Sequence, residues 1–167
     1  LRANERPGGP SRSTEVAYWI GCAHEALGQA EKARASWAEA AAATEVAGGG
    51  GRSGRRGEGG VALAGRVTRY FQALALRKSN LPDQATAIFR ELVNAGTAGL
   101  APSAQAGDPA PAFGLQPSMR TRTAIAHYVS GLGYAGLGEK TRARDAFTAA
   151  LAAAPDHLGA RLALGQL

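Results

Sequence analysis

The stretch of residues 123–155, TAIAHYVSGLGYAGLGEKTRARDAFTAALAAAP, decides the fold. Its first half carries apolar or small side chains at steps of three and four residues, which is the spacing of one face of a helix. Gly138 follows, and glycine adopts the left-handed conformation that helix ends often need. A second helical face continues to Pro155, which cannot extend a helix. The stretch therefore predicts two short helices that pack as antiparallel neighbours across a tight turn.

Two earlier stretches of the chain repeat the same order of small, aromatic and turn residues. Gly21, Ala73 and Gly131 are the equivalent small residues on the first helix of each pair. We therefore predict three helix pairs that use matching packing positions. These positions are Gly21, Ala33 and Trp37 in the first pair, Ala73, Ala85 and Phe89 in the second, and Gly131, Tyr134, Gly138, Ala143, Phe147, Ala150 and Pro155 in the third.

The offsets of these residues resemble those of the tetratricopeptide repeat (TPR), which places small, aromatic and turn residues at these spacings. The resemblance implies an all-α fold in which antiparallel helix pairs stack as a short TPR-like α-solenoid with a C-terminal capping helix. An unbroken array of this family steps by about 34 residues. The steps from Gly21 to Ala73 and from Ala73 to Gly131 are longer, which implies two long irregular loops. A second resemblance, to the C-terminal repeat region of larger bacterial TPR proteins, rests on the runs AYWIGCAHEALG, RYFQALALRKSN, AHYVSGLGYAGLGEKTRARDAF and PDHLGARLAL. The front half of those proteins is an uncharacterised domain, for which a carbohydrate-related role is one interpretation.

Composition divides the chain into seven segments. Proline, glycine and charge predict a disordered tail over residues 1–12, and glycine and arginine predict a flexible linker over residues 48–60. A further irregular loop, rich in Pro, Gly and Ala, is expected over residues 97–117. The three TPR-like repeats then occupy residues 13–47, 61–96 and 118–155, and the capping helix occupies residues 156–167.

Residues suited to helix starts and turns mark these boundaries. Ser13 is expected to cap the first helix, and Pro82 fits the first turn of the second helix of the middle pair. Asn80 stands where the other two pairs have a turn glycine. Asp156 is expected to cap the last helix, since a repeat array needs an end cap. The residues of that helix that would cover the third pair are Leu158, Leu162 and Ala163.

In TPR arrays the first helix of each pair lines a concave groove, and the resemblance implies three rows of matching residues along it. The first row is Tyr18, Tyr70 and Tyr128, the second is Cys22, Leu74 and Leu132, and the third is Glu25, Arg77 and Ala135. Tyrosine offers rigid apolar area and a hydroxyl, which suits peptide or sugar recognition. The alternative is that the tyrosines brace neighbouring helices. The chaperone-binding members of the family hold a C-terminal peptide with lysine and asparagine side chains in this groove. The three rows carry neither residue, so a carboxylate clamp for chaperones is not expected.

A formal charge of +6 keeps a nucleic-acid partner as an alternative. Arginines in and after the Gly-rich linker would form a basic patch that binds phosphate groups, as Arg-Gly-Gly (RGG) segments do. No aromatic residue lies among the linker glycines to stack on bases, so a solvated spacer is the favoured interpretation. The residues of such a patch would be Arg52, Arg55, Arg56, Arg66 and Arg69.

No catalytic, cofactor or metal site is expected from the sequence. The histidines and Cys22 lack the spacing of a metal site, and a single cysteine cannot form an internal disulfide. Two runs of glycines match GxGxxG, but neither follows a strand, so neither predicts dinucleotide binding. These runs are Gly49, Gly51 and Gly54 in the linker and Gly131, Gly133 and Gly136 in the third repeat.

We therefore expect a non-enzymatic interaction scaffold that binds a protein or peptide partner in the groove. The first alternative is an accessory repeat region of a larger bacterial protein, and the second is a basic nucleic-acid-binding module. No signal peptide and no long apolar run are visible, so we expect a cytoplasmic protein without membrane contact. The chain opens with Leu1 rather than methionine, so we also consider that an amino-terminal part, with an enzymatic domain, is missing.

Overall fold

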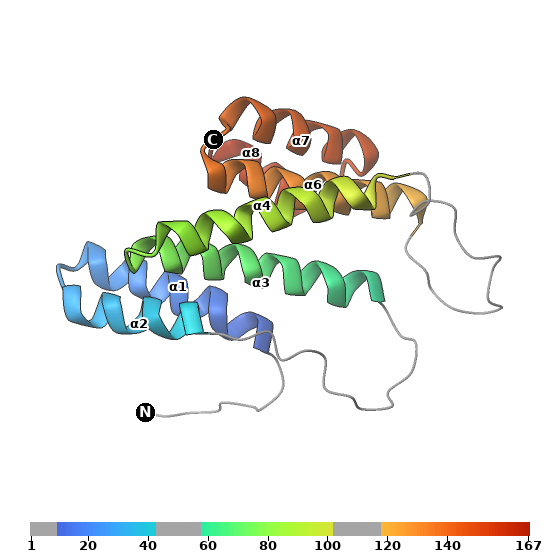
Figure 1. Cartoon of the computed structure of the whole chain (residues 1–167). Coiled ribbons are helices and arrows are strands. Elements are labelled where there is room, and N and C mark those ends of the chain that lie inside the picture. Colours follow the sequence, from blue (N-terminus) through green and yellow to red (C-terminus); the bar gives the residue numbers. More distant parts are fainter. Residues whose placement is uncertain (1–9, 43–57, 102–117) are drawn as a thin grey trace, which may run out of the picture.

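A computed structural model of the protein describes residues 10–42, 58–101 and 118–167. Within these residues the chain forms seven α-helices and no strand. The helices pack in sequential pairs, which Figure 1 shows as successive layers from the blue helices to the red ones. The helices are α1 (Pro10–Ala26), α2 (Ala30–Ala42), α3 (Glu58–Lys78), α4 (Pro82–Gly99), α6 (Met119–Leu137), α7 (Lys140–Ala153) and α8 (Leu158–Gly165).

The first helix of each later pair contacts both helices of the pair before it. Helix α3 contacts α1 and α2, and α6 contacts α3 and α4. Helix α8 continues this arrangement, because it contacts α6 and α7. The buried side chains form three clusters that follow the pairs, and each cluster also includes residues of a neighbouring pair.

The turn inside each pair has one residue with a left-handed backbone. Gly28 has a φ of 70°, Asn80 a φ of 60° and Gly138 a φ of 79°. Asparagine tolerates this conformation better than other side chains do. The prediction that Asn80 replaces a turn glycine is therefore confirmed by its conformation. Pro82 begins α4, as its fixed φ allows at the first helical position.

Small residues on first helices let aromatic rings of second helices reach the core. A Cβ atom on Gly131 would lie 2.5 Å from the Phe147 ring. A Cβ atom on Gly21 would likewise overlap the Trp37 ring. The aromatic side chains are almost fully buried, with Phe147 at 0% and Trp37 at 5% exposure. Gly21 and Trp37 are thus in contact within the first pair, and Gly131 and Phe147 are in contact within the third.

Other glycines bring α4 and α6 together. A Cβ atom on Gly133 would lie 2.6 Å from the Phe89 carbonyl oxygen, and one on Gly136 would overlap the Phe89 ring. From the opposite side, a Cβ atom on Gly96 would lie 2.6 Å from the Ser130 nitrogen. The glycine run of α6, which matches GxGxxG by spacing, therefore serves close helix packing.

Several predicted boundaries are wrong. Helix α1 begins at Pro10, which suits a first helical turn, so Ser13 lies inside the helix rather than at the position before it. Helix α3 begins at Glu58, within the predicted linker. Helix α4 continues through Gly99, although an irregular loop was expected from residue 97, because Gly96 and Gly99 lie against α6. The rest of the predicted tail, linker and loop lies outside the described residues.

The last helix also differs from expectation. His157, not Asp156, is its N-cap, and its Nδ1 accepts a hydrogen bond of 3.1 Å from the Ala160 N–H. Leu158 and Leu162 point outward, with 64% and 59% of their surfaces exposed. The residues that pack on the third pair are Ala160, Ala163, Leu164 and Leu167. None of the described helices has the length and apolar character that crossing a membrane requires.

Candidate functional site

A pocket of about 490 Å³ lies where α1, α3, α6 and α8 meet. Its walls are mostly apolar, and two charged residues, Glu15 and Lys140, contribute to its lining. The remaining lining residues are Trp19 from α1, Val67, Tyr70 and Phe71 from α3, Tyr128, Leu132 and Ala135 from α6, Gly138 and Phe147 around the α6–α7 turn and α7, and Gly159, Leu162, Ala163, Gln166 and Leu167 from the C-terminal segment.

The predicted row of tyrosines is brought together. Tyr70 lies close enough to both Tyr18 and Tyr128 to raise the pKa of each, although burial is the larger cause in both cases. Burial also raises the pKa of Tyr70, and burial raises that of Tyr128 to about 12. Tyr70 and Tyr128 line the pocket, whereas Tyr18 is not part of its lining.

These tyrosines also brace the helices, which was the alternative interpretation of the row. The Tyr70 ring lies 5.9 Å from that of Phe89, and the Tyr128 ring lies 6.0 Å from that of Phe147. Each ring thus packs on the buried aromatic residue of its own pair. Tyr128 also lies 4.7 Å from the His157 ring at the start of α8. Removing the Tyr70 or the Tyr128 ring would therefore change packing as well as the pocket.

The second predicted row contributes one residue to the pocket. Cys22 is half-buried, and the pKa of the neighbouring Tyr18 is raised first by burial and then by this thiol. Leu74 packs against the core cluster of the second pair. Leu132 is 4% exposed and both belongs to the third cluster and lines the pocket.

The charged residues of the third row make contacts between helices. The Glu25 carboxylate accepts a hydrogen bond of 2.6 Å from the Lys78 Nζ, which joins α1 to α3. The Arg77 Nη1 donates to the Gly136 carbonyl oxygen over 3.1 Å, and its guanidinium lies 5.6 Å from the centre of the Phe89 ring. Neither residue lines the pocket, whereas Ala135 does.

Several pocket residues were not expected from the sequence. Trp19 and Phe71 each follow a tyrosine of the first row, and their rings lie 6.1 Å apart. The repeated Tyr-aromatic pair was a signal that could have revealed them. Leu162 and Lys140 gave no such signal, because only the stacking of α7 and α8 on α6 brings them to the pocket.

The two charged pocket residues differ in their partners. The Lys140 Nζ donates to the Leu167 carbonyl oxygen over 2.8 Å. Among the described residues, no cation forms an ion pair with Glu15. Its carboxylate instead acts on Tyr128, whose pKa it raises after the larger effects of burial and Tyr70. Glu15 is therefore the acidic residue of the pocket lining.

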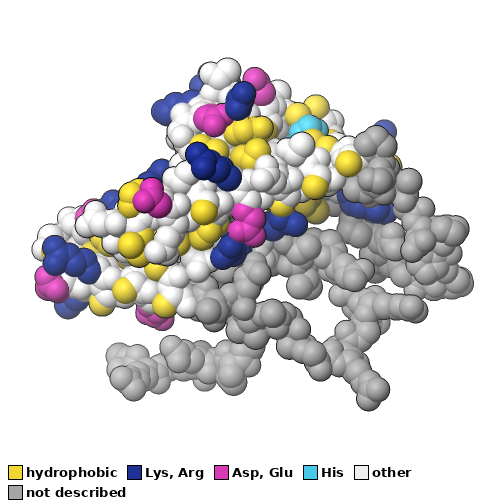
Figure 2. All heavy atoms as spheres, in the orientation of Figure 1, with side chains coloured by type: hydrophobic (Ala, Val, Ile, Leu, Met, Phe, Trp, Pro, Cys, Tyr) yellow, Lys and Arg dark blue, Asp and Glu magenta, His cyan; other side chains and the backbone are white. Residues whose placement is uncertain are grey.

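The described basic residues do not gather into one patch on the face that Figure 2 draws, where basic and acidic side chains are interspersed. The Arg69 Nη2 lies 2.6 Å from the Glu91 carboxylate, and its Nη1 donates to the Gln72 side chain. Arg66 lies on α3 and is half-buried. The linker arginines, Arg52, Arg55 and Arg56, lie outside the described residues.

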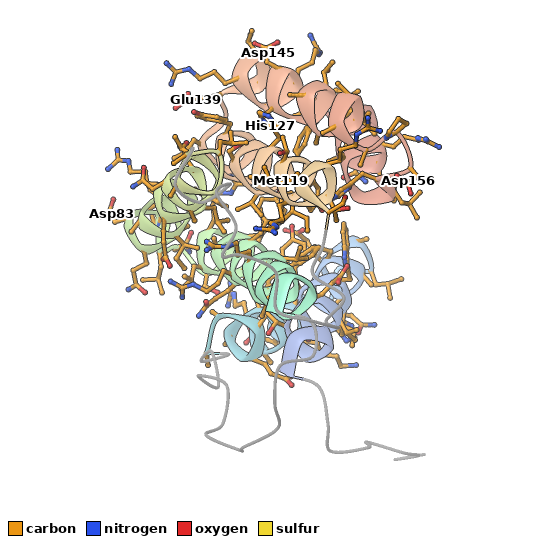
Figure 3. All side chains as sticks on the ribbon, turned by 90° about the vertical axis from the view of Figure 1, so that its right-hand side faces the viewer. Asp83, Met119, His127, Glu139, Asp145 and Asp156 are labelled. Carbon is orange, nitrogen blue, oxygen red and sulfur yellow. The ribbon has the colours of Figure 1, made fainter. Side chains whose placement is uncertain are left out.

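Among the described residues, His, Cys, Asp and Glu side chains do not cluster in threes. No group of three or more His, Cys, Asp or Glu side chains in the described segments could hold a metal ion. His24 shares a hydrogen bond of 2.9 Å with Gln29, and burial lowers the pKa of His127. Figure 3 shows four acidic residues, Asp83, Glu139, Asp145 and Asp156, spread over different parts of the surface rather than facing one another.

The part of the chain that the structure describes is all-helical and built from sequential helix pairs, with a pocket lined by aromatic residues of α1, α3, α6 and α7. No family model, no curated protein and no solved structure shows significant similarity to this chain.

Proposed function

We propose that this protein is a non-enzymatic scaffold of three TPR-like repeats and a capping helix, and that it binds a peptide segment of a protein partner in the pocket. The observation that carries this proposal is the position of Tyr70 and Tyr128. They occupy equivalent places on successive first helices and line one pocket together. A groove formed by matching residues of stacked helix pairs is the binding surface that such arrays use.

The repeat packing supports the TPR-like part of the proposal. Gly21 with Trp37, Ala73 with Phe89, and Gly131 with Phe147 occupy equivalent positions, and each couple lies in one buried contact or cluster. The left-handed turn residue recurs in all three pairs. In addition, α3 contacts both helices of the first pair and α6 contacts both helices of the second, as expected for a continuous stack of repeats.

The lining of the pocket supports a peptide as the ligand. Its volume of about 490 Å³ falls within the roughly 300–1,000 Å³ of ordinary ligand sites. Aromatic walls favour a bulky apolar side chain, because aromatic residues bury large areas with little loss of conformational entropy. Glu15, which no described cation neutralises, favours a lysine or arginine next to that side chain in the ligand.

Two leucines on α8 allow a matched test. Leu162 lines the pocket and Leu158 does not, yet both side chains are more than half exposed on the same helix. Peptides selected from a random displayed library on the wild-type protein would be titrated against Leu162→Glu and Leu158→Glu by fluorescence anisotropy. We expect Leu162→Glu to weaken binding by at least about tenfold, which corresponds to roughly 1.4 kcal/mol. Leu158→Glu is expected to bind like the wild type.

The outcome separates the pocket from other surfaces. Equal affinity of the wild type and Leu162→Glu for every selected peptide would place binding elsewhere and refute the proposal. Failure to select any peptide that binds the folded protein would refute it as well. Circular dichroism spectra of both variants check that neither substitution changes the helical content.

A further inference from the structure

One end of the pocket combines aromatic rings with a carboxylate. We call it the acidic end and define it as Glu15, Trp19, Tyr70, Phe71 and Tyr128, all of which line the pocket. Glu15 and Trp19 are four residues apart on α1, a spacing that places both side chains on the same face of the helix. The Glu15 carboxylate is also near enough to Tyr128 to raise the pKa of that phenol, after the larger effects of burial and Tyr70.

The rings of the acidic end meet at steep angles. The centres of the Trp19 and Phe71 rings lie 6.1 Å apart, and the ring planes make an angle of 62°. The Tyr70 and Phe71 rings lie 5.7 Å apart at an angle of 68°. Rings at such angles bound a space from different sides. Surrounding aromatic rings are the usual means by which proteins recognise quaternary ammonium groups, because the negative face of each ring attracts the cation.

The other charge of the pocket, that of Lys140, lies toward the opposite end. Lys140 begins α7, just after the turn at Gly138. That turn is roughly 15 Å further along α6 than Tyr128, at a rise of about 1.5 Å per residue. The Lys140 Nζ donates to the Leu167 carbonyl oxygen over 2.8 Å. Among the described residues no cation forms an ion pair with Glu15, so the acidic end retains a negative charge for a ligand.

A methylated lysine has both properties that the acidic end favours, apolar bulk and positive charge. An unmodified lysine ammonium has three N–H donors and is strongly hydrated, so enclosing it among aromatic rings leaves donors without acceptors. Methylation replaces the donors with apolar groups and keeps the charge. The aliphatic stem of the side chain would lie along Val67 and Leu162, which line the same pocket.

We propose that the acidic end binds the trimethylammonium group of a methylated lysine in the peptide partner. This inference rests on the proposed function, because it names the side chain that the bound peptide inserts into the pocket. The Glu15 carboxylate attracts the charge, and the rings of Trp19, Phe71 and Tyr128 enclose the methyl groups. The attraction between a ring and a cation strengthens as the cation loses water, which favours this partly enclosed site over the open surface.

Three small amino alcohols and alcohols test the acidic end without any peptide. Choline carries the trimethylammonium group, 3,3-dimethyl-1-butanol is its uncharged analogue of the same shape, and ethanolamine is its unmethylated analogue. The chain has two tryptophans, of which Trp19 lines the pocket and Trp37 is buried outside it. In an NMR titration of the full chain, millimolar choline is expected to shift the Trp19 indole N–H signal and to leave that of Trp37 unchanged. The other two compounds are expected to bind at least about tenfold more weakly.

Two variants test the two parts of the acidic end. Glu15→Gln removes the charge and keeps the shape, and it is expected to weaken choline binding by at least about threefold. Trp19→Leu replaces a half-exposed ring and is expected to have a similar effect, followed through the Phe71 amide signal because the Trp19 signal is lost. Glu39→Gln removes the same charge from an exposed position of α2 outside the pocket and should bind choline like the wild type.

A peptide arm distinguishes a methylated lysine from a free quaternary ammonium compound. Each peptide selected on the wild type is synthesised again with lysine, or with trimethyllysine, in place of its central apolar residue. Fluorescence anisotropy is expected to show at least about tenfold tighter binding of a trimethyllysine peptide than of its lysine counterpart. Choline binding without this preference would assign the pocket to a free ligand and overturn the inference.

The remaining outcomes separate this inference from the proposed function. Equal affinities for choline and 3,3-dimethyl-1-butanol would overturn the inference, because the pocket would then recognise apolar bulk alone. Equal affinities for choline and ethanolamine would overturn it as well, because methylation would then contribute nothing. Peptide binding that Leu162→Glu abolishes, in a protein whose Trp19 signal ignores choline, would refute the methylated lysine and leave the proposed function intact.

Discussion

The ring of Phe147 occupies the space that a side chain on Gly131 would need, since a Cβ atom there would lie 2.5 Å from the ring. The contact joins α6 to α7 and leaves Phe147 with 0% of its surface exposed. The first pair repeats it with Gly21 and Trp37. The glycine on the first helix of each of these pairs thus allows the aromatic ring of the second helix to pack closely against it.

Gly131→Leu is expected to destabilise the protein. The added side chain would displace the Phe147 ring from the core, and overpacking of this kind typically costs about 1–3 kcal/mol. Thermal unfolding followed by circular dichroism measures the effect as a lower melting temperature. Gly165→Ala is the control, because nothing lies within 4 Å of a Cβ atom there. Equal melting temperatures for Gly131→Leu and the wild type would mean that the α6–α7 contact is wrong.

Gly138→Ala is expected to destabilise the protein for a different reason. No atom lies within 4 Å of a Cβ atom at this position, so the substitution causes no steric overlap. The φ of 79° is unfavourable for alanine, and left-handed conformations cost residues with side chains roughly 1–2 kcal/mol. Urea denaturation measures the loss. The account of the turn fails if Gly138→Ala unfolds at the same urea concentration as Gly165→Ala.

Arg77→Met is expected to reduce stability without reducing peptide binding. The substitution removes the hydrogen bond to the Gly136 carbonyl oxygen and the cation over the Phe89 ring. The expected loss is about 1 kcal/mol, as for a typical hydrogen bond. Arg34→Met removes an ion pair of exposed side chains and is expected to have a smaller effect. Weaker peptide binding by a folded Arg77→Met variant would instead place Arg77 in the groove.

Stability is expected to fall at alkaline pH because of the buried tyrosines. Burial raises the pKa of Tyr128 from its ordinary value of 10.0 to about 12. As the pH rises above 10, the unfolded state releases this proton while the folded state retains it. The stabilisation is therefore complete below the unfolded pKa and is lost as the pH rises through the folded pKa.

Urea denaturation at a series of pH values measures this dependence. Tyr128 alone contributes up to about a tenfold increase in the unfolding equilibrium constant per pH unit. Tyr128→Phe removes that contribution, so the free energy of unfolding of this variant is expected to decline less steeply with pH. Some decline is expected to remain, because burial also raises the pKa of Tyr18 and of Tyr70. An identical decline in the variant would show that the Tyr128 hydroxyl is not buried in the folded protein.

The helix pairs were predictable because their signals are local and recur. The steps of three and four residues, the small residue opposite an aromatic one and the turn residue all lie within one pair. Even Asn80, which departs from glycine, takes the expected left-handed conformation.

The helix ends were less predictable because tertiary contacts decide them. Gly96 and Gly99 suggest a loop by composition, but both lie against α6, and that packing offsets their low helix propensity. Both Asp156 and His157 precede α8, and only the backbone conformation determines that His157 caps it.

The pocket was predictable in part. Matching positions on successive first helices identified Tyr70, Tyr128, Leu132 and Ala135. Trp19 and Leu162 lie far apart in the sequence, and the pocket includes both because the helix pairs stack. The sequence pattern also assigned Glu25 and Arg77 to the groove, although their charges bind neighbouring helices instead.

The most direct measurement of the central claim is the mapping of a bound peptide by NMR chemical-shift changes in the 167-residue chain. With a selected peptide added, the account predicts that the largest changes fall on Trp19, Tyr70, Tyr128 and Leu162, which line the pocket from four helices. Leu81, an exposed residue before α4 that does not line the pocket, should remain unchanged. Changes centred on Leu81 or elsewhere outside the pocket, with the four pocket residues unaffected, would contradict the account.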